Sequence, residues 1–107
     1  MSGTPETGNS FEKNFVEGVY VACTTLGNAA NNQQLVDRSG RVIDTSNCNA
    51  FGKTVEVNLA GITSAKQAYA VGYNRALNSM FQYEPLCDPQ NNCITRSDFL
   101  SMLQGAG

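Results

Sequence analysis

The stretch SAKQAYAVGYNRALNSMFQY, residues 64–83, carries the strongest pattern in the chain. Its bulky apolar side chains recur at helical spacing and therefore share one face of an α-helix. Ser64 is a suitable cap for the first turn, and Gln67 three residues later completes a capping-box pattern. We predict a long helix that begins after Ser64 and organises the fold. Its apolar face comprises Tyr69, Tyr73, Ala76, Leu77, Met80 and Phe81.

A strip of small residues runs beside this face: Ala68, Gly72 and Ala76. Glycine inside a helix costs about 1 kcal/mol relative to alanine, so the space at Gly72 is expected to serve a purpose. One interpretation is that a second helix packs closely against the strip. The other is an open groove that receives a ligand or a partner's helix.

An earlier segment supplies a candidate for that second helix. Ser10 can cap it, Gly27 is a natural stop, and its apolar residues follow a helical period. We therefore predict two long antiparallel helices, with Phe11, Phe15 and Val19 packed against the small strip. The remaining apolar residues of the first helix are Ala22, Cys23 and Leu26.

The segment between the two helices has the periodicity of strands. Residues 35–44, LVDRSGRVID, place two short β-branched runs around a Ser-Gly turn, which is typical of a hairpin. Residues 54–59, TVEVNL, alternate strictly and predict a third strand. A sheet of this size is marginal alone, so we expect it to lie against a helix.

The C-terminal part is expected to hold a turn-rich loop, residues 84–93, and then a short helix capped by Thr95 and ended by Gly105. The fold class is thus α+β and mostly helical, with a small antiparallel sheet. We assign residues 10–107 to a single globular domain. Residues 1–9 are polar and predict a flexible leader, either a trimmed terminus or the tether of a lipoprotein whose anchor was removed.

Four cysteines in 107 residues are typical of an exported protein. Three disulfide pairings are possible, and we favour Cys23 with Cys48 and Cys87 with Cys93, because each ties a loop to a nearby helix end without crossing the other. A four-cysteine zinc site fits less well, since zinc knuckles place two ligands two to four residues apart.

Charge and composition limit the function classes. The net charge is −2, and the seven lysines and arginines are scattered, which disfavours nucleic acid as a partner. No apolar run reaches the length of a membrane span. Histidine is absent, which removes the commonest acid/base group and metal ligand, so we expect no catalytic site, metal or cofactor.

The leading hypothesis is a non-enzymatic periplasmic or extracellular module that binds another protein. In architecture it resembles small periplasmic accessory proteins, such as immunity proteins and secretion-system pilotins. Among the tyrosines, which are common at binding hot spots, Tyr69, Tyr73 and Tyr83 are the candidates, together with Gly72 of the strip. Two alternatives stay open: a carrier of a small ligand or lipid in the strip groove, and a hydrolase that uses two carboxylates.

Overall fold

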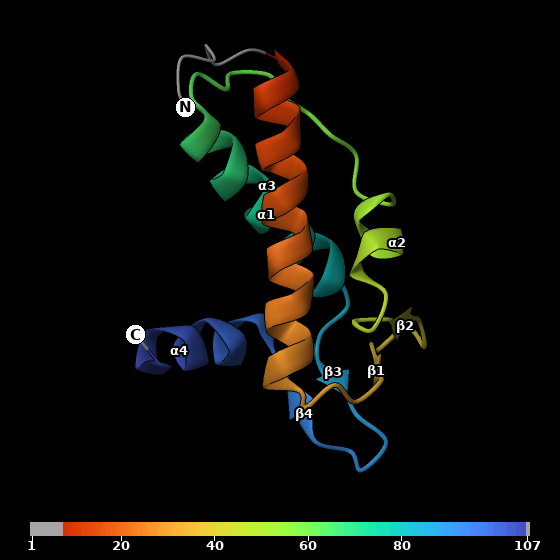
Figure 1. The fold of residues 1–107 in the computed structure, drawn as a ribbon. Coiled ribbons are helices and arrows are strands. Elements are labelled where there is room, and N and C mark those ends of the chain that lie inside the picture. Colours follow the sequence, from red (N-terminus) through yellow and green to blue (C-terminus); the bar gives the residue numbers. More distant parts are fainter. Residues whose placement is uncertain (1–7, 107) are drawn as a thin grey trace.

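The computed structural model describes residues 8–106 and confirms an α+β fold that is about half helical. Two long helices cross each other above a small antiparallel sheet at one end of the molecule, and two shorter helices follow the hairpins of that sheet (Figure 1). The helices are α1 (Gly8–Ala29), α2 (Cys48–Gly52), α3 (Ala65–Met80) and α4 (Arg96–Ala106). The strands are β1 (Leu35–Val36), β2 (Val42–Ile43), β3 (Leu86–Cys87) and β4 (Cys93–Ile94).

Helix α3 forms where its pattern predicts. The Ser64 hydroxyl accepts a hydrogen bond from the Gln67 amide at 3.1 Å, as expected for a cap. The Gln67 side chain reaches back to the Thr63 amide at 2.8 Å, one residue before the expected partner. The helix ends at Met80; its small strip, Leu77 and Met80 are buried, and Tyr69 and Tyr73 are half-buried.

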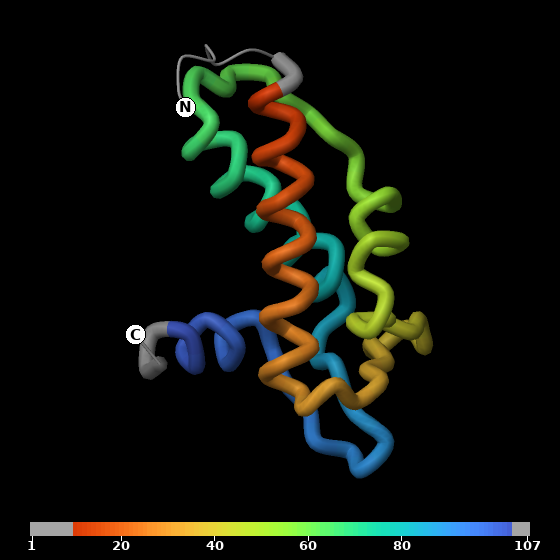
Figure 2. Tube along the Cα trace, viewed as in Figure 1, coloured from red at the N-terminus to blue at the C-terminus, as the bar shows by residue number. Residues whose placement is uncertain are grey.

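The direction of the helix pair differs from the prediction. Helices α1 and α3 both run toward the sheet and cross, so they are not antiparallel (Figure 2). The long connection explains the difference, because the hairpin, α2 and residues 53–63 carry the chain back to the start of α1 before α3 begins. We call residues 53–63 the return segment.

The ends of α1 also lie beyond the predicted ones. Ser10 lies inside the helix, since α1 begins at Gly8; the remainder of the expected leader, residues 1–7, lies outside the described residues. At the other end the helix passes Gly27, which is buried, and runs to Ala29. Asn31 and Asn32 then adopt φ values of 56° and 58°, and the Asn32 amide bonds back to the Gly27 carbonyl at 2.7 Å. Left-handed residues that satisfy the last carbonyls are an ordinary way to end a helix.

The sheet has the order β2-β1-β3-β4, with all neighbours antiparallel. The hairpin of β1 and β2 is the predicted one. The hairpin of β3 and β4 replaces the expected loop, because residues 86–87 and 93–94 pair around a turn. The predicted strand at residues 54–59 is wrong: Thr54 and Val55 belong to the turn after α2, and residues 56–59 run on as an open stretch that forms no ladder (Figure 2). Side chains along residues 54–59 alternate between exposed and half-buried. Extended backbone is enough to give the alternating pattern.

The two hairpins repeat each other in sequence and in hydrogen bonding. LVDRSGRVI at residues 35–43 corresponds to LCDPQNNCI at residues 86–94. In each turn an aspartate Oδ1 accepts backbone N–H groups from two and four residues later, at 3.0 and 2.9 Å for Asp37 and at 2.9 and 2.9 Å for Asp88. In each, the residue three positions after the aspartate has positive φ: Gly40 at 91° and Asn91 at 65°.

The long helices repeat as well. Residues 15–26 of α1 correspond to residues 69–80 of α3, and the equivalent pairs are Gly18 with Gly72, Ala22 with Ala76, Cys23 with Leu77 and Leu26 with Met80. The contact is reciprocal: a Cβ on Gly18 would collide with the Tyr69 carbonyl oxygen, and a Cβ on Gly72 would collide with that of Phe15, the equivalent of Tyr69. The long helix and the hairpin after it are therefore repeated, and their reciprocal contact and the sheet order indicate an approximate two-fold relation between the two halves; the short helices α2 and α4 differ in length.

Candidate functional site

The small strip of α3 is a packing surface. Ala68, Gly72 and Ala76 are buried, and the backbone of Phe15 lies directly against Gly72. The first interpretation of the strip, a closely packed second helix, is therefore confirmed. Gly72 is not accessible to a partner, and the groove expected for a small-ligand carrier is filled by α1.

The structure brings two of the three candidate tyrosines together. Tyr69 and Tyr73 are half-buried neighbours on α3, with ring centroids 6.4 Å apart. Burial raises the pKa of the Tyr73 hydroxyl, a hydrogen bond with Thr25 opposes the rise, and Tyr69 adds to it. Tyr83 lies beyond the end of α3 and is 40% exposed, with its hydroxyl 3.4 Å from the Gln82 amide nitrogen. The three tyrosines thus do not form one site.

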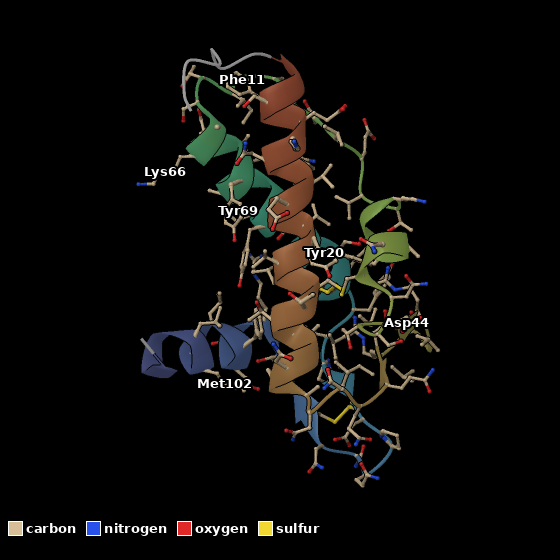
Figure 3. All side chains as sticks on the ribbon, in the orientation of Figure 1. Phe11, Tyr20, Asp44, Lys66, Tyr69 and Met102 are labelled. Carbon is tan, nitrogen blue, oxygen red and sulfur yellow. A yellow bond between two sulfur atoms is a disulfide. The ribbon has the colours of Figure 1, made fainter. Side chains whose placement is uncertain are left out.

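Both favoured disulfides are present. Cys23 and Cys48 join α1 to α2 with a Cα–Cα distance of 5.7 Å, and Cys87 and Cys93 close the second hairpin at 4.0 Å. Both pairs are visible as yellow bonds in Figure 3. The first bridge fixes α2 beside α1, and this placement forms one wall of a groove.

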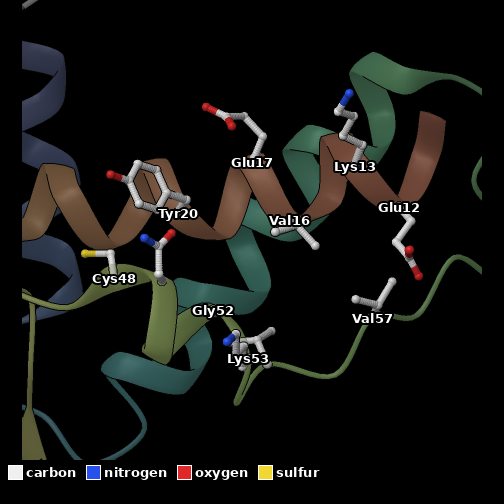
Figure 4. Close-up of a pocket in the computed structure, with 11 residues that line it drawn as sticks. Glu12, Lys13, Val16, Glu17, Tyr20, Cys48, Gly52, Lys53 and Val57 are labelled. Carbon is white, nitrogen blue, oxygen red and sulfur yellow. The ribbon is translucent and has the colours of Figure 1, made fainter. Parts of the chain in front are cut away.

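The groove lies between α1, α2 and the return segment and has a volume of about 1040 Å³. Val16 and Tyr20 of α1 and Val55 and Val57 of the return segment are its apolar lining. In Figure 4 the side chains of Glu12 and Val16 point from α1 toward the return segment, where Val57 faces them. We call this the α1 groove.

Val16 and Tyr20 are exposed although they are large and apolar, at 42% and 39%. Their equivalents in the second half are Ala70 and Asn74, which are also exposed. The second half thus forms the same helix with a small and a polar residue at these positions. The fold does not require a valine and a tyrosine there, so their presence calls for another explanation.

Charged side chains border the α1 groove: Glu12, Lys13, Glu17 and Lys53. Among residues 8–106 none of the four takes part in an ion pair; the ion pair there joins Arg41 Nε and Asp37 Oδ2 at 3.1 Å. Glu56 of the return segment is exposed as well. The groove therefore offers carboxylates and ammonium groups that an incoming molecule can engage.

Asp37 and Asp88 both line a second, smaller groove beside the sheet. Burial acts to raise the pKa of Asp37, but the hydrogen bonds from Ser39 and Arg41 outweigh it and lower the pKa below its ordinary value. Hydrogen bonds from the Asn92 backbone and side chain and from Gln90 likewise lower the pKa of Asp88. A general acid requires a raised pKa, and the pKa values of both carboxyls are lowered. Asp37 and Asp88 are therefore suited to stay ionised and to stabilise their turns as hydrogen-bond acceptors.

No family model matches the chain, and comparisons with curated proteins and with solved structures found no match. Among the helices of residues 8–106, none has the length and apolar character that crossing a membrane requires. The α1 groove is therefore the candidate functional site. Its key residues carried a weak signal in the sequence: Val16 and Tyr20 are apolar but fall outside the buried face of α1.

Proposed function

We propose that this chain is a non-enzymatic, exported module that binds another protein through the α1 groove. The observation that carries the proposal is the exposure of Val16 and Tyr20 in an open groove, at positions where the second half has Ala70 and Asn74. Tyrosine in such a setting offers a rigid apolar body with a polar tip, as binding hot spots do.

The two disulfides support an exported location. Two bridges join all four cysteines, which is compatible with an oxidising, exported location. The chain's small size, helix content and disulfides favour binders such as periplasmic immunity proteins and secretion-system accessory proteins. A secreted toxin or an envelope component is thus the first kind of partner to test.

The experiment compares the wild-type protein with a variant whose groove copies the second half, Val16→Ala with Tyr20→Asn. Each immobilised protein is incubated with periplasmic and secreted proteins of the source cell, and the captured species are identified and measured by calorimetry. We expect the variant to bind the partner at least about tenfold more weakly, a loss of one ordinary hot-spot contact.

The matched control replaces the equivalent residues of α3, Ala70→Ser with Asn74→Ala, and is expected to leave binding unchanged. Thermal melts of all three proteins verify that the substitutions leave the fold intact. The proposal is wrong if no partner is captured, or if the groove variant binds every captured partner as tightly as the wild type does.

A further inference from the structure

We infer that the partner enters the α1 groove as an extended strand and pairs with the backbone of residues 55–59. This inference rests on the proposed function, because it names the form in which a protein partner is recognised. It is argued from the backbone of the return segment, the shape of the groove and the charges around it.

The backbone of the return segment is unpaired where it passes the groove. In the part of the chain that the structure describes, the amide N–H groups of residues 56–59 donate no hydrogen bond, and the carbonyls of residues 55–58 accept none. Backbone N–H and C=O groups are strong hydrogen-bonding groups that call for partners. An exposed run of them in extended conformation is the template onto which another chain adds a strand.

The side chains of this stretch are arranged as they are in a strand that lies on a core. Val55, Val57 and Leu59 are partly buried and pack against the core, whereas Glu56 and Asn58 are exposed. A strand that pairs with this backbone and lies in the groove would also lie over Val16 and Tyr20 and would cover their exposed surface. The groove volume of about 1040 Å³ is large enough for a short peptide segment, since small-ligand pockets span about 300–1,000 Å³.

The charges define the partner further. Two carboxylates, Glu12 and Glu17, and two ammonium groups, Lys13 and Lys53, line the groove, and Glu12 points toward Val57 of the return segment (Figure 4). A segment with lysine or arginine opposite Glu12 is complementary to the carboxylate that faces the return segment. The partner segment is thus extended and apolar at alternate positions, with a basic residue near Glu12.

Two other occupants fit less well. A helix satisfies its own N–H and C=O groups internally and would leave the backbone of residues 56–59 unpaired. A second copy of this chain that paired through its own residues 55–59 would bring Glu56, and no basic residue of that stretch, toward Glu12, and juxtaposed like charges disfavour a complex. Both occupants are outcomes of the experiment below.

The probe is a displayed library of random peptides, each about ten residues long, the upper length of an ordinary strand. Peptides selected on the wild-type protein are synthesised and measured by calorimetry. We expect enriched sequences to alternate apolar and polar residues and to contain lysine or arginine. Their affinity should fall at least about tenfold on Val16→Ala with Tyr20→Asn, and should weaken as salt is added.

Amide hydrogen exchange reports the pairing directly. In the free protein the amides of residues 56–59 should exchange rapidly, and the bound peptide should protect alternate ones, because successive N–H groups of a strand point to opposite edges. Peptides N-methylated at alternate residues should lose binding in one register and keep it in the other. Peptide affinity is also compared between two variants: Glu56→Pro, which removes one backbone N–H, and Glu56→Ala, which keeps it.

Each contrary result has a distinct meaning. Peptides that bind through Val16 and Tyr20 without protecting any amide of residues 56–59 overturn the strand inference but leave the proposed function intact. A library that yields no binder dependent on these two residues also overturns the inference, and the capture experiment then decides the proposed function separately. Protection of the same amides by self-association alone would assign the edge to a second copy and overturn the inference as well.

Discussion

Replacing Gly72 with alanine tests whether the close helix crossing holds the two halves together. A Cβ at this position would lie well under 3.0 Å from the carbonyl oxygen of Phe15, a separation that real Cβ atoms essentially never show. The obstacle is backbone, so no side-chain rotation relieves it. The helices must therefore separate.

The expected cost follows from that separation. Ordinary contact begins at 3.4 Å, so the helices must move apart by on the order of an ångström, and a gap of about 0.5–1 Å already forfeits a quarter to a half of the dispersion attraction. Overpacking of this kind costs about 1–3 kcal/mol and occasionally more. Alanine returns about 1 kcal/mol as the better helix former. Because the obstacle is backbone, we take the upper end of the range, about 3 kcal/mol; less the gain of about 1 kcal/mol, this gives a net loss of about 2 kcal/mol in the free energy of unfolding.

The assay is urea unfolding with linear extrapolation, in which a changed midpoint at constant slope indicates a change in stability. Gly52→Ala is the control, since its new Cβ would meet only a Val19 methyl at 3.9 Å. Gly18→Ala should behave like Gly72→Ala, and the double variant should lose less than the sum because both act on one crossing. Wild-type stability of Gly72→Ala would refute the packing argument.

Three further predictions concern stability. Replacing Cys23 and Cys48 with serine should cost about 3.5 kcal/mol for a sequence separation of 25, and the shorter Cys87 and Cys93 loop about 2 kcal/mol, by the chain-entropy estimate; denaturant melts that reverse this order would contradict it. The pKa of Asp37 is lowered on folding, so its contribution is present above the ordinary value of 3.8 and is lost as the pH falls through the lower folded pKa; Asp37→Asn should flatten the acid end of the stability profile, and an unchanged profile would show that other groups cause it. Phe99 is fully buried, and its ring centroid lies 5.8 Å from that of Phe81. Phe99→Ala should lower the free energy of unfolding by about 3–5 kcal/mol, whereas Leu100→Ala on the exposed side should lower it far less, as measured by thermal melts.

Features with strong local signals were predictable from the sequence. The cap at Ser64, the first hairpin and the start of α4 each depend on a contact between residues close in the sequence. At the start of α4 the Asp98 amide donates to the Thr95 hydroxyl at 3.1 Å, and the Asp98 carboxylate accepts from the Thr95 amide at 3.0 Å. The disulfide pairing was predicted because each bridge joins a loop to a nearby helix end without crossing the other bridge, and it is confirmed.

Features that depend on distant parts of the chain were not predictable in the same way. The direction of α1 relative to α3 is determined by the route of the return segment, and the alternating pattern of residues 54–59 does not specify where that segment runs. The second hairpin was missed because Pro85 and Pro89 and the asparagines resemble a loop. A comparison of residues 35–43 with residues 86–94 would have revealed it, since the leucine, aspartate and isoleucine recur at equivalent places.

The candidate site lay between these cases. Small residues at Ala68, Gly72 and Ala76 correctly indicated a close approach, but the approaching group is α1 of the same chain. The α1 groove was less accessible to prediction, because the return segment had been interpreted as a strand whose backbone would already be paired. An extended stretch and a strand have the same side-chain alternation and differ only in hydrogen bonds.

The duplicated architecture also determines how the chain can fold. Each half covers the small-residue face of the other, and β1 pairs with β3 of the other half as well as with β2 of its own. Neither half encloses a hydrophobic core by itself, so neither is expected to persist as a partly folded intermediate. The contacts that close the core join residues near 15 to residues near 72, and residues near 36 to residues near 87. High contact order of this kind slows folding relative to a helical bundle of similar length, even though half of the chain is helical.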